Sequence, residues 1–193
     1  MKKKEVFVKE ISYINDENIR KDAEFLMDNL PDYFYRVATS SSGKYHPRYS
    51  NGEGGLIRHT KSAVRIAKEL LDNPLIGSKY SSREKDFAIL ALLVHDGLKS
   101  GKTESKYHKT EHPLYAAEYV KENKGSLSLD DKDIEILAKT ISSHMGPWNK
   151  DFDGNVVLPV PNGKLENFVH MCDYLASRKF LNVDFDEENN LLD

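Results

Sequence analysis

The side chains best suited to chemistry in this sequence are imidazoles and carboxylates that fall on apolar helix faces. His95 and Asp96 are adjacent, and they close the apolar run 87–94. Four more residues of these two types each lie on the apolar face of a separate predicted helix: His59, His112, His144 and Asp173. A buried carboxylate or imidazolium without a partner costs several kcal/mol. The simplest arrangement that satisfies all six is a shared centre of metal cations, and we expect two.

Histidine is the commonest protein ligand for transition metals, and carboxylates complete such sites. Four imidazoles and two carboxylates are enough for a bridged two-metal site that leaves coordination positions for water. Such a site generates hydroxide near neutral pH and clamps the entering and leaving oxygens of a phosphoryl transfer. Imidazole-rich sites take Mn, Fe, Co, Ni or Zn according to availability, so the sequence leaves the two divalent metals open, Mg included.

Helical spacing positions these residues. His59, Ala63, Ile66 and Leu70 share one face of a helix predicted over 56–71. The next predicted helix begins at Ser81 or Ser82 and ends near His95. Further helices are predicted over 16–30, 112–124 and 130–144, and from 163 onward. The expected fold is therefore mainly α, a single helical bundle with at most one small β-hairpin near 151–161, where an Asp-Gly pair precedes a Val-Val-Leu run.

A chain of 193 residues predicts one domain. We expect residues 1–53 to supply an N-terminal helix and a loop beside the active site within that domain. Residues 54–182 would form the metal-binding core, and residues 183–193 a frayed acidic tail. Weak alternation over 5–14 suggests a short strand or an arm.

The composition of the chain limits the binding partners and the cellular location that can be expected. The net charge of −3 argues against a broad basic groove for nucleic acid, although a short single strand remains admissible. No run approaches the ~18 apolar residues that a membrane span needs, and no signal-peptide pattern is present. Cys172 is the only cysteine, so no intramolecular disulfide can form, which favours a cytoplasmic location. The sequence carries no signal for an oligomeric state.

Four segments together resemble the HD-domain metal-dependent phosphohydrolase superfamily, over roughly residues 54–180. They are Gly54-Gly-Leu-Ile-Arg-His-Thr60, Leu92-Leu-Val-His-Asp-Gly-Leu-Lys99, Ser143-His-Met-Gly146 and Asp173-Tyr-Leu-Ala-Ser-Arg178. The match is closest to the branch with two extra histidines between the His-Asp pair and the final Asp. One departure stands out: the family usually has His-Asp-x-Gly-Lys, whereas here Gly97 precedes Leu98, with Lys99 in its usual place.

The resemblance implies a ligand set for a dinuclear centre. By position, His59, His95, Asp96 and Asp173 would hold one metal. Asp96 would bridge to a second metal, which His112 and His144 would complete.

Several polar side chains are candidates for binding substrate. Lys99 is expected to bind a substrate phosphate or assist the leaving group, unless it is a solvated loop lysine. Arg178 could contact phosphate or form a salt bridge at a helix end. His46 could lie over the active site and bind the phosphate, with Lys44 as a further phosphate partner, or it could be an ordinary loop histidine. Trp148 follows Gly-Pro close to His144, and it could stack on a base or simply pack. His170 is expected to hydrogen-bond near the metal ligands.

These observations predict an enzyme, a phosphohydrolase or phosphodiesterase acting on a nucleotide or related phosphate ester through a metal-bridging hydroxide. A second hypothesis is an HD-type mixed-valent di-iron oxygenase, because the ligand set alone does not separate the two. The lysine-rich loop after Asp96 favours phosphate. A third hypothesis is a non-catalytic nucleotide-binding sensor. The presence of all six candidate ligands ranks it last.

Overall fold

The computed structural model describes residues 3–40, 46–105, 107–181 and 184–192. These residues form eight α-helices and four short 3-10 turns, with no strand among them, so the prediction of a mainly α fold is confirmed. The helices are α1 (Val8–Ile11), α2 (Glu17–Asn29), α3 (Gly55–Asp72), α4 (Pro74–Gly77), α5 (Ser82–Val94), α6 (His112–Glu122), α7 (Asp131–Ser142) and α8 (Lys164–Ala176). The 3-10 turns are η1 (Lys3–Phe7), η2 (Asp32–Tyr35), η3 (Arg48–Ser50) and η4 (Lys124–Ser126).

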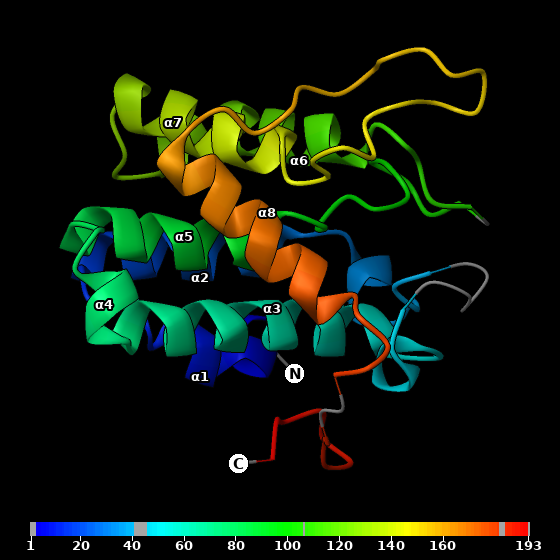
Figure 1. Cartoon of the computed structure of the whole chain (residues 1–193), viewed down its shortest axis with the longest axis horizontal. Helices are drawn as coiled ribbons and strands as arrows, with labels where there is room; N and C mark the ends of the chain where they lie inside the picture. The colour runs from blue at the N-terminus through cyan, green and yellow to red at the C-terminus, as the bar shows by residue number, and fades with distance from the viewer. Residues whose placement is uncertain (1–2, 41–45, 106, 182–183, 193) are drawn as a thin grey trace.

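Helix α5 lies at the centre of the bundle. Every residue from Asp86 to Val94 is buried, as expected for a helix that is apolar on all sides. It packs against α2, α3, α7 and α8, and Figure 1 shows α8 crossing it diagonally. A capping box between Ser81 and Glu84 fixes its first turn, at the start that the sequence predicts. None of the described helices is both long enough and apolar enough to traverse a lipid bilayer.

Helix direction brings the polar ends of several helices together. In Figure 1, α3 and α6 begin toward the right, and α5, α7 and α8 run from the left toward that side. Helices α6 and α7 pack against each other, as do α3 and α8, and contacts of α7 with α5 and α8 join these pairs into one core. One end of the bundle therefore collects residues from five helices.

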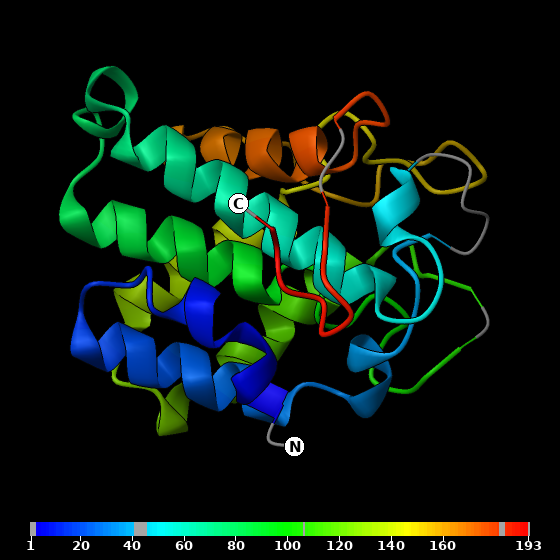
Figure 2. The same cartoon turned by 90° about the horizontal axis from the view of Figure 1, so that it is seen from below.

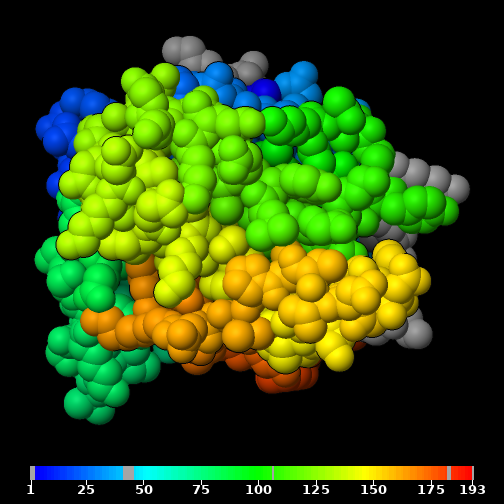
Figure 3. Space-filling model, turned by 90° about the horizontal axis from the view of Figure 1, so that it is seen from above, coloured from blue at the N-terminus to red at the C-terminus, as the bar shows by residue number. Residues whose placement is uncertain are grey.

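The structure corrects two local predictions. The segment 5–14 is not a strand: η1 and α1 occupy it, with Phe7 and Ile11 buried in the core. The hairpin expected near 151–161 is not formed either, because the segment contains a single isolated antiparallel bridge between Lys150 and Val156. Val156 is 66% exposed and Leu158 is the one residue of the Val-Val-Leu run that is buried, so the run offers little apolar surface to stabilise a sheet. Figure 3 shows this connection, in yellow and orange, as part of the molecular surface beside α8.

The acidic tail is not frayed over its described residues 184–192. It returns along α3, as seen from below in Figure 2. The rings of Tyr49 and Phe185 are 5.4 Å apart, and Arg58 donates a hydrogen bond to the side chain of Asn189. These contacts cover the first turns of α3, next to the region where the candidate ligands lie.

Candidate metal centre

The structure brings the six predicted ligands together at one end of the bundle. His59 lies one turn into α3, the His95-Asp96 pair follows α5 directly, and Asp173 is in the last turn of α8. His112 is the first residue of α6, and His144 lies just beyond α7. The four imidazoles and the Asp96 carboxylate are buried, with exposed fractions of 0–3%. Helix ends position most of these residues, so their side chains point inward while the chain departs into loops.

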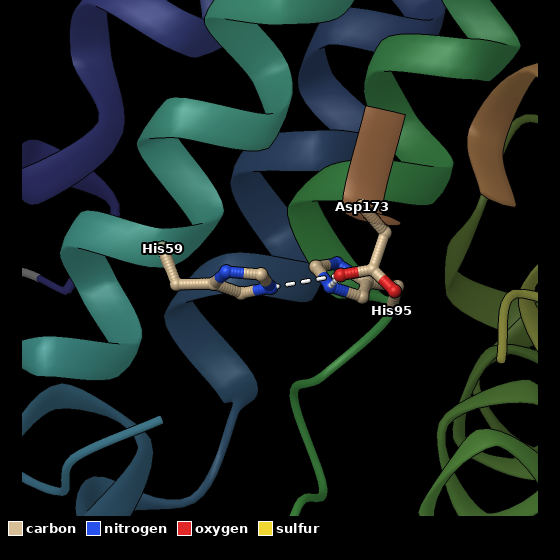
Figure 4. Close-up of side chains that lie close together, drawn as sticks. All are labelled: His59, His95 and Asp173. Carbon is tan, nitrogen blue, oxygen red and sulfur yellow. Dashed lines mark hydrogen bonds and ion pairs between the residues drawn. The ribbon is translucent and has the colours of Figure 1, made fainter. Parts of the chain in front are cut away.

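His59, His95 and Asp173 form the first ligand group (Figure 4). The Nε2 atom of His59 lies 2.9 Å from Oδ1 of Asp173, and Nε2 of His95 lies 3.5 Å from the same oxygen. Figure 4 shows these three side chains, from α3, the end of α5 and α8, pointing toward one another. Two imidazoles and a carboxylate at these distances could hold one cation.

His112 and His144 form the second ligand group. Their Nε2 atoms are 3.2 Å apart, and they lie 2.9 Å and 3.5 Å from Oδ1 of Asp96. The other oxygen of Asp96, Oδ2, lies 3.7 Å from Nε2 of His59 and 3.5 Å from Nε2 of His95. Each oxygen of this carboxylate therefore faces a different pair of imidazoles. This is the arrangement that a carboxylate bridging two cations requires.

Backbone hydrogen bonds orient three of the imidazoles. In His95, His112 and His144, Nδ1 lies 2.7 Å from the carbonyl oxygen of the residue three positions earlier. A neutral imidazole that donates from Nδ1 presents a lone pair at Nε2, which is how metal-binding histidines are usually held. Nε2 of His95 has no hydrogen-bond partner among the described residues. Nε2 of His112 and Nε2 of His144 face each other as two acceptors, so the donor set fits a metal cation.

The electrostatics of the centre favour ionised carboxylates and a neutral His112. Burial raises the pKa of Asp96, but Lys99 and the nearby imidazoles outweigh it and hold that pKa well below its ordinary value. Asp173 behaves in the same way beside His59 and His95. Burial, followed by the Lys99 ammonium, lowers the pKa of His112 to about 3. Carboxylates are thus ionised and His112 is neutral at pH 7, as ligands must be.

Lys99 lies inside the centre and is only 8% exposed, so it is not a solvated loop lysine. Its Nζ atom lies 2.7 Å from each oxygen of Asp96 and 3.3 Å from Nε2 of His112. The unusual Gly97 helps to place it. A Cβ atom at Gly97 would lie 2.5 Å from Cδ2 of Leu30, so glycine lets the turn after Asp96 approach the chain near α2 closely. The reordered motif therefore keeps Lys99 directed at Asp96.

A cavity of about 570 Å³ opens beside the centre. Its lining includes three of the predicted substrate-binding residues, His46, Trp148 and Arg178, together with Lys99 and Asp173. Trp148 is half exposed, so it does not simply pack in the core. The fifth residue predicted to bind substrate, Lys44, lies outside the described residues.

His46 approaches the first ligand group from the loop before α3. Its ring centroid is 5.7 Å from that of His59, and its Nδ1 atom is buried without a hydrogen-bond partner among the described residues. Burial lowers the pKa of His46 to about 3, so the ring is neutral at pH 7. His46 can therefore offer a hydrogen bond to a bound ligand, but it carries no charge for a phosphate.

Sequence reasoning missed Tyr174, which forms part of the cavity wall. Its ring stacks on Trp148 with centroids 5.4 Å apart and an angle of 13° between the planes. The guanidinium of Arg178 lies 4.1 Å from the Tyr174 centroid. Arg178 follows Tyr174 by four residues, just beyond the end of α8, and this spacing was a usable signal for the contact. Met145 and Ser177, which also line the cavity, carried no comparable signal.

His170 supports the second ligand group, as the sequence suggested. Its Nδ1 atom donates a 2.7 Å hydrogen bond to the carbonyl oxygen of His144. Gly146 makes this contact possible: its φ is +61°, and a Cβ atom there would lie 2.2 Å from the His170 ring. A residue with a side chain would be strained by its backbone and would also displace the imidazole.

Comparison with known protein families gives one match, to the HD domain, over residues 56–178. This span is well over half of the chain and includes all six candidate ligands. The chain therefore belongs to the HD-domain family, and the resemblance seen in the sequence is confirmed. Comparisons with curated proteins and with solved structures gave no match.

Proposed function

We propose that this protein is a metal-dependent phosphohydrolase or phosphodiesterase that acts on a nucleotide or related phosphate ester. The observation that carries the proposal is the placement of Asp96, whose two oxygens each face a separate pair of imidazoles. Membership of the HD-domain family supports the same chemistry. Asp96 and the two ligand groups would together hold two divalent transition metals, Mn, Fe, Co, Ni or Zn, with Mg also admissible.

Two bound cations would supply an activated water and neutralise charge on the phosphoryl oxygens. The chain's own part is to hold the six ligands in a fixed, buried arrangement. The hydrogen bonds from Nδ1 to backbone carbonyls fix the ring orientations of His95, His112 and His144. Because these rings need not reorganise, the centre is prepared for charge that develops during the reaction.

The substrate would bind in the adjoining cavity. Its volume of about 570 Å³ is typical of a small-molecule site and suits one nucleotide, or the end of a short single strand. Lys99 and Arg178 are the cationic side chains in its lining, and both would contact phosphate. Trp148 presents a half-exposed ring, backed by Tyr174, on which a base can stack.

A panel of metals and substrates tests the proposal. The protein is stripped with a chelator, reloaded with Mn²⁺, Fe²⁺, Co²⁺ or Mg²⁺, and assayed with phosphomonoesters and phosphodiesters. We expect turnover that depends on metal. The Asp96→Ala variant should lose both bound metal and activity. Asp22→Asn is the matched control, because Asp22 is also a buried carboxylate, but its oxygens accept hydrogen bonds from Ser128 rather than facing the imidazoles.

Undiminished turnover by Asp96→Ala would reject the assignment. The same experiment separates the rival functions. If an iron-loaded sample consumed oxygen in the presence of a polyol or a phosphonate, the protein would be assigned as an oxygenase instead of a hydrolase. Tight nucleotide binding with no turnover under any metal would instead indicate a sensor.

A further inference from the structure

The ammonium group of Lys99 occupies a place that a cation of the second ligand group would need. That group offers three inward-facing atoms: Oδ1 of Asp96 and the Nε2 atoms of His112 and His144. Nζ of Lys99 contacts the first two, at 2.7 Å and 3.3 Å, and it also lies 2.7 Å from Oδ2 of Asp96, the oxygen that faces the first group. The one imidazole that it contacts among the described residues is His112, in the second group. The side chain is also buried, so the contact is not a transient surface pairing.

The first ligand group is different, because it has a carboxylate of its own. Asp173 forms its close ionic contacts with His59 and His95, and none with a lysine or arginine among the described residues. A cation in this group can therefore use Asp173 whether or not Lys99 stays on Asp96. A cation in the second group has no acidic ligand except Asp96, which it must share with the ammonium.

We propose that Lys99 competes with the second cation, so that the two metals load in sequence. The first would bind in the first ligand group with Lys99 in place, and the second only after the ammonium leaves Asp96. An ammonium and a divalent cation on one oxygen repel each other strongly. This inference rests on the metal centre proposed above, and it adds an order of binding to it.

The structure also indicates where the ammonium goes. Lys99 already lines the cavity, and its stem is long and flexible. Its backbone is held on both sides, because its N–H donates to Asp96 and its carbonyl accepts from Lys109. Only the side chain is free to move, and rotation carries Nζ toward the bound substrate. Loading of the second metal would thereby release Lys99 to contact a substrate phosphate.

Metal titrations of matched variants test this inference without an activity assay. Wild-type protein, Lys99→Met, Lys99→Gln and Lys99→Arg are stripped and titrated with Mn²⁺ by calorimetry and by electron paramagnetic resonance. We expect wild type and Lys99→Arg to bind a second Mn²⁺ at least about tenfold more weakly than the first. Lys99→Met should tighten this second site at least about tenfold. Lys99→Gln does the same, and it serves if the methionine variant folds poorly.

Lys102→Met is the charge control, because Lys102 is exposed and pairs with Glu122. It should titrate like wild type. Equal second-site affinity in wild type and Lys99→Met would overturn the inference while leaving the metal centre intact. An equal gain from Lys102→Met would overturn it as well, because the effect would then be general. Failure of every variant to bind Mn²⁺ would reject the metal centre, and the inference with it.

Discussion

The two ligand groups on either side of Asp96 use the same kinds of atoms but differ in charge. The first group contains Asp173. Burial lowers the pKa of His95 in this group, but the carboxylates of Asp96 and Asp173 outweigh burial and raise that pKa above its ordinary value. The second group has no acid of its own and faces the Lys99 ammonium. Burial and that ammonium lower the pKa of His112 to about 3. The two groups therefore differ in two charges, the extra carboxylate of the first and the ammonium beside the second, and we expect the first group to hold its cation more tightly.

Loss of the acid of the first group is expected to have the largest effect. Asp173→Asn keeps the shape of the side chain and removes its charge, so the tighter cation should be lost. We expect kcat to fall roughly 10²- to 10³-fold or more, the scale for removing one preorganised electrostatic group. Metal analysis should find less than one metal per chain. Two metals per chain in this variant would contradict the stronger role of this group.

His112→Gln is the counterpart in the second group. It removes one imidazole and leaves the first group unchanged, so one metal per chain should remain. We expect kcat to fall about 10²-fold, less than for Asp173→Asn. If His112→Gln lost both metals, cation binding in the first group would depend on the second group. The two groups could then not be treated as separate binding sites.

Trp148 lies in the cavity wall but belongs to neither ligand group, so its ring should affect substrate binding alone. Trp148→Ala should raise KM for a nucleotide about tenfold with little change in kcat, because stacking on one base is worth about 1–3 kcal/mol. Phe152→Ala is the control: Phe152 is an aromatic residue of the same connection but 99% exposed. Equal effects of the two substitutions would remove Trp148 from the site.

Gly146→Ala probes the support of the second group. The strained φ and the lost His170 contact should lower the free energy of unfolding by about 2 kcal/mol. The affinity for the second cation should fall about tenfold, the lower end for loss of a group that orients a ligand. The first cation should bind as before. Calorimetry measures both affinities, and denaturant titration measures the stability.

Acidity should separate the two groups in the metal-free protein. NMR of the imidazole nitrogens should show His95 titrating above pH 6.5 and His112 well below it. Burial lowers the pKa values of His46, His108 and His112 in the folded protein. Below pH 6.5 the unfolded chain therefore binds more protons at these histidines than the folded chain does. Stability should therefore fall as pH is lowered from about 6.5 toward 4, a loss that His95, with its raised pKa, offsets only in part.

Periodicity made the helices and the ligands predictable. His59 repeats with apolar residues at helical spacing, and Ser81, Asp16 and Asp130 cap helices at the starts that the sequence indicates. Each ligand type is also written directly in the sequence. The ligand residues lie on apolar helix faces. Because such faces pack into one shared core, their side chains could be predicted to converge.

Features that depend on distant contacts were not predictable in this way. The tail 184–192 lies along α3 because Asn189 and Asn190 meet Arg58 and Lys61, pairs more than 120 residues apart. The 151–161 segment has turn residues and apolar residues, but the described part of the chain offers no neighbouring strand for it to pair with. The burial of Lys99 against Asp96 and His112 likewise depends on residues that only the fold brings around it.

Anomalous diffraction from crystals soaked in excess Mn²⁺ tests the central claim most directly. The account predicts two peaks, one beside each oxygen of Asp96, at the roughly 3.5–4 Å separation typical of two-metal sites. A single peak that persists at saturating Mn²⁺, or peaks away from Asp96, would contradict it.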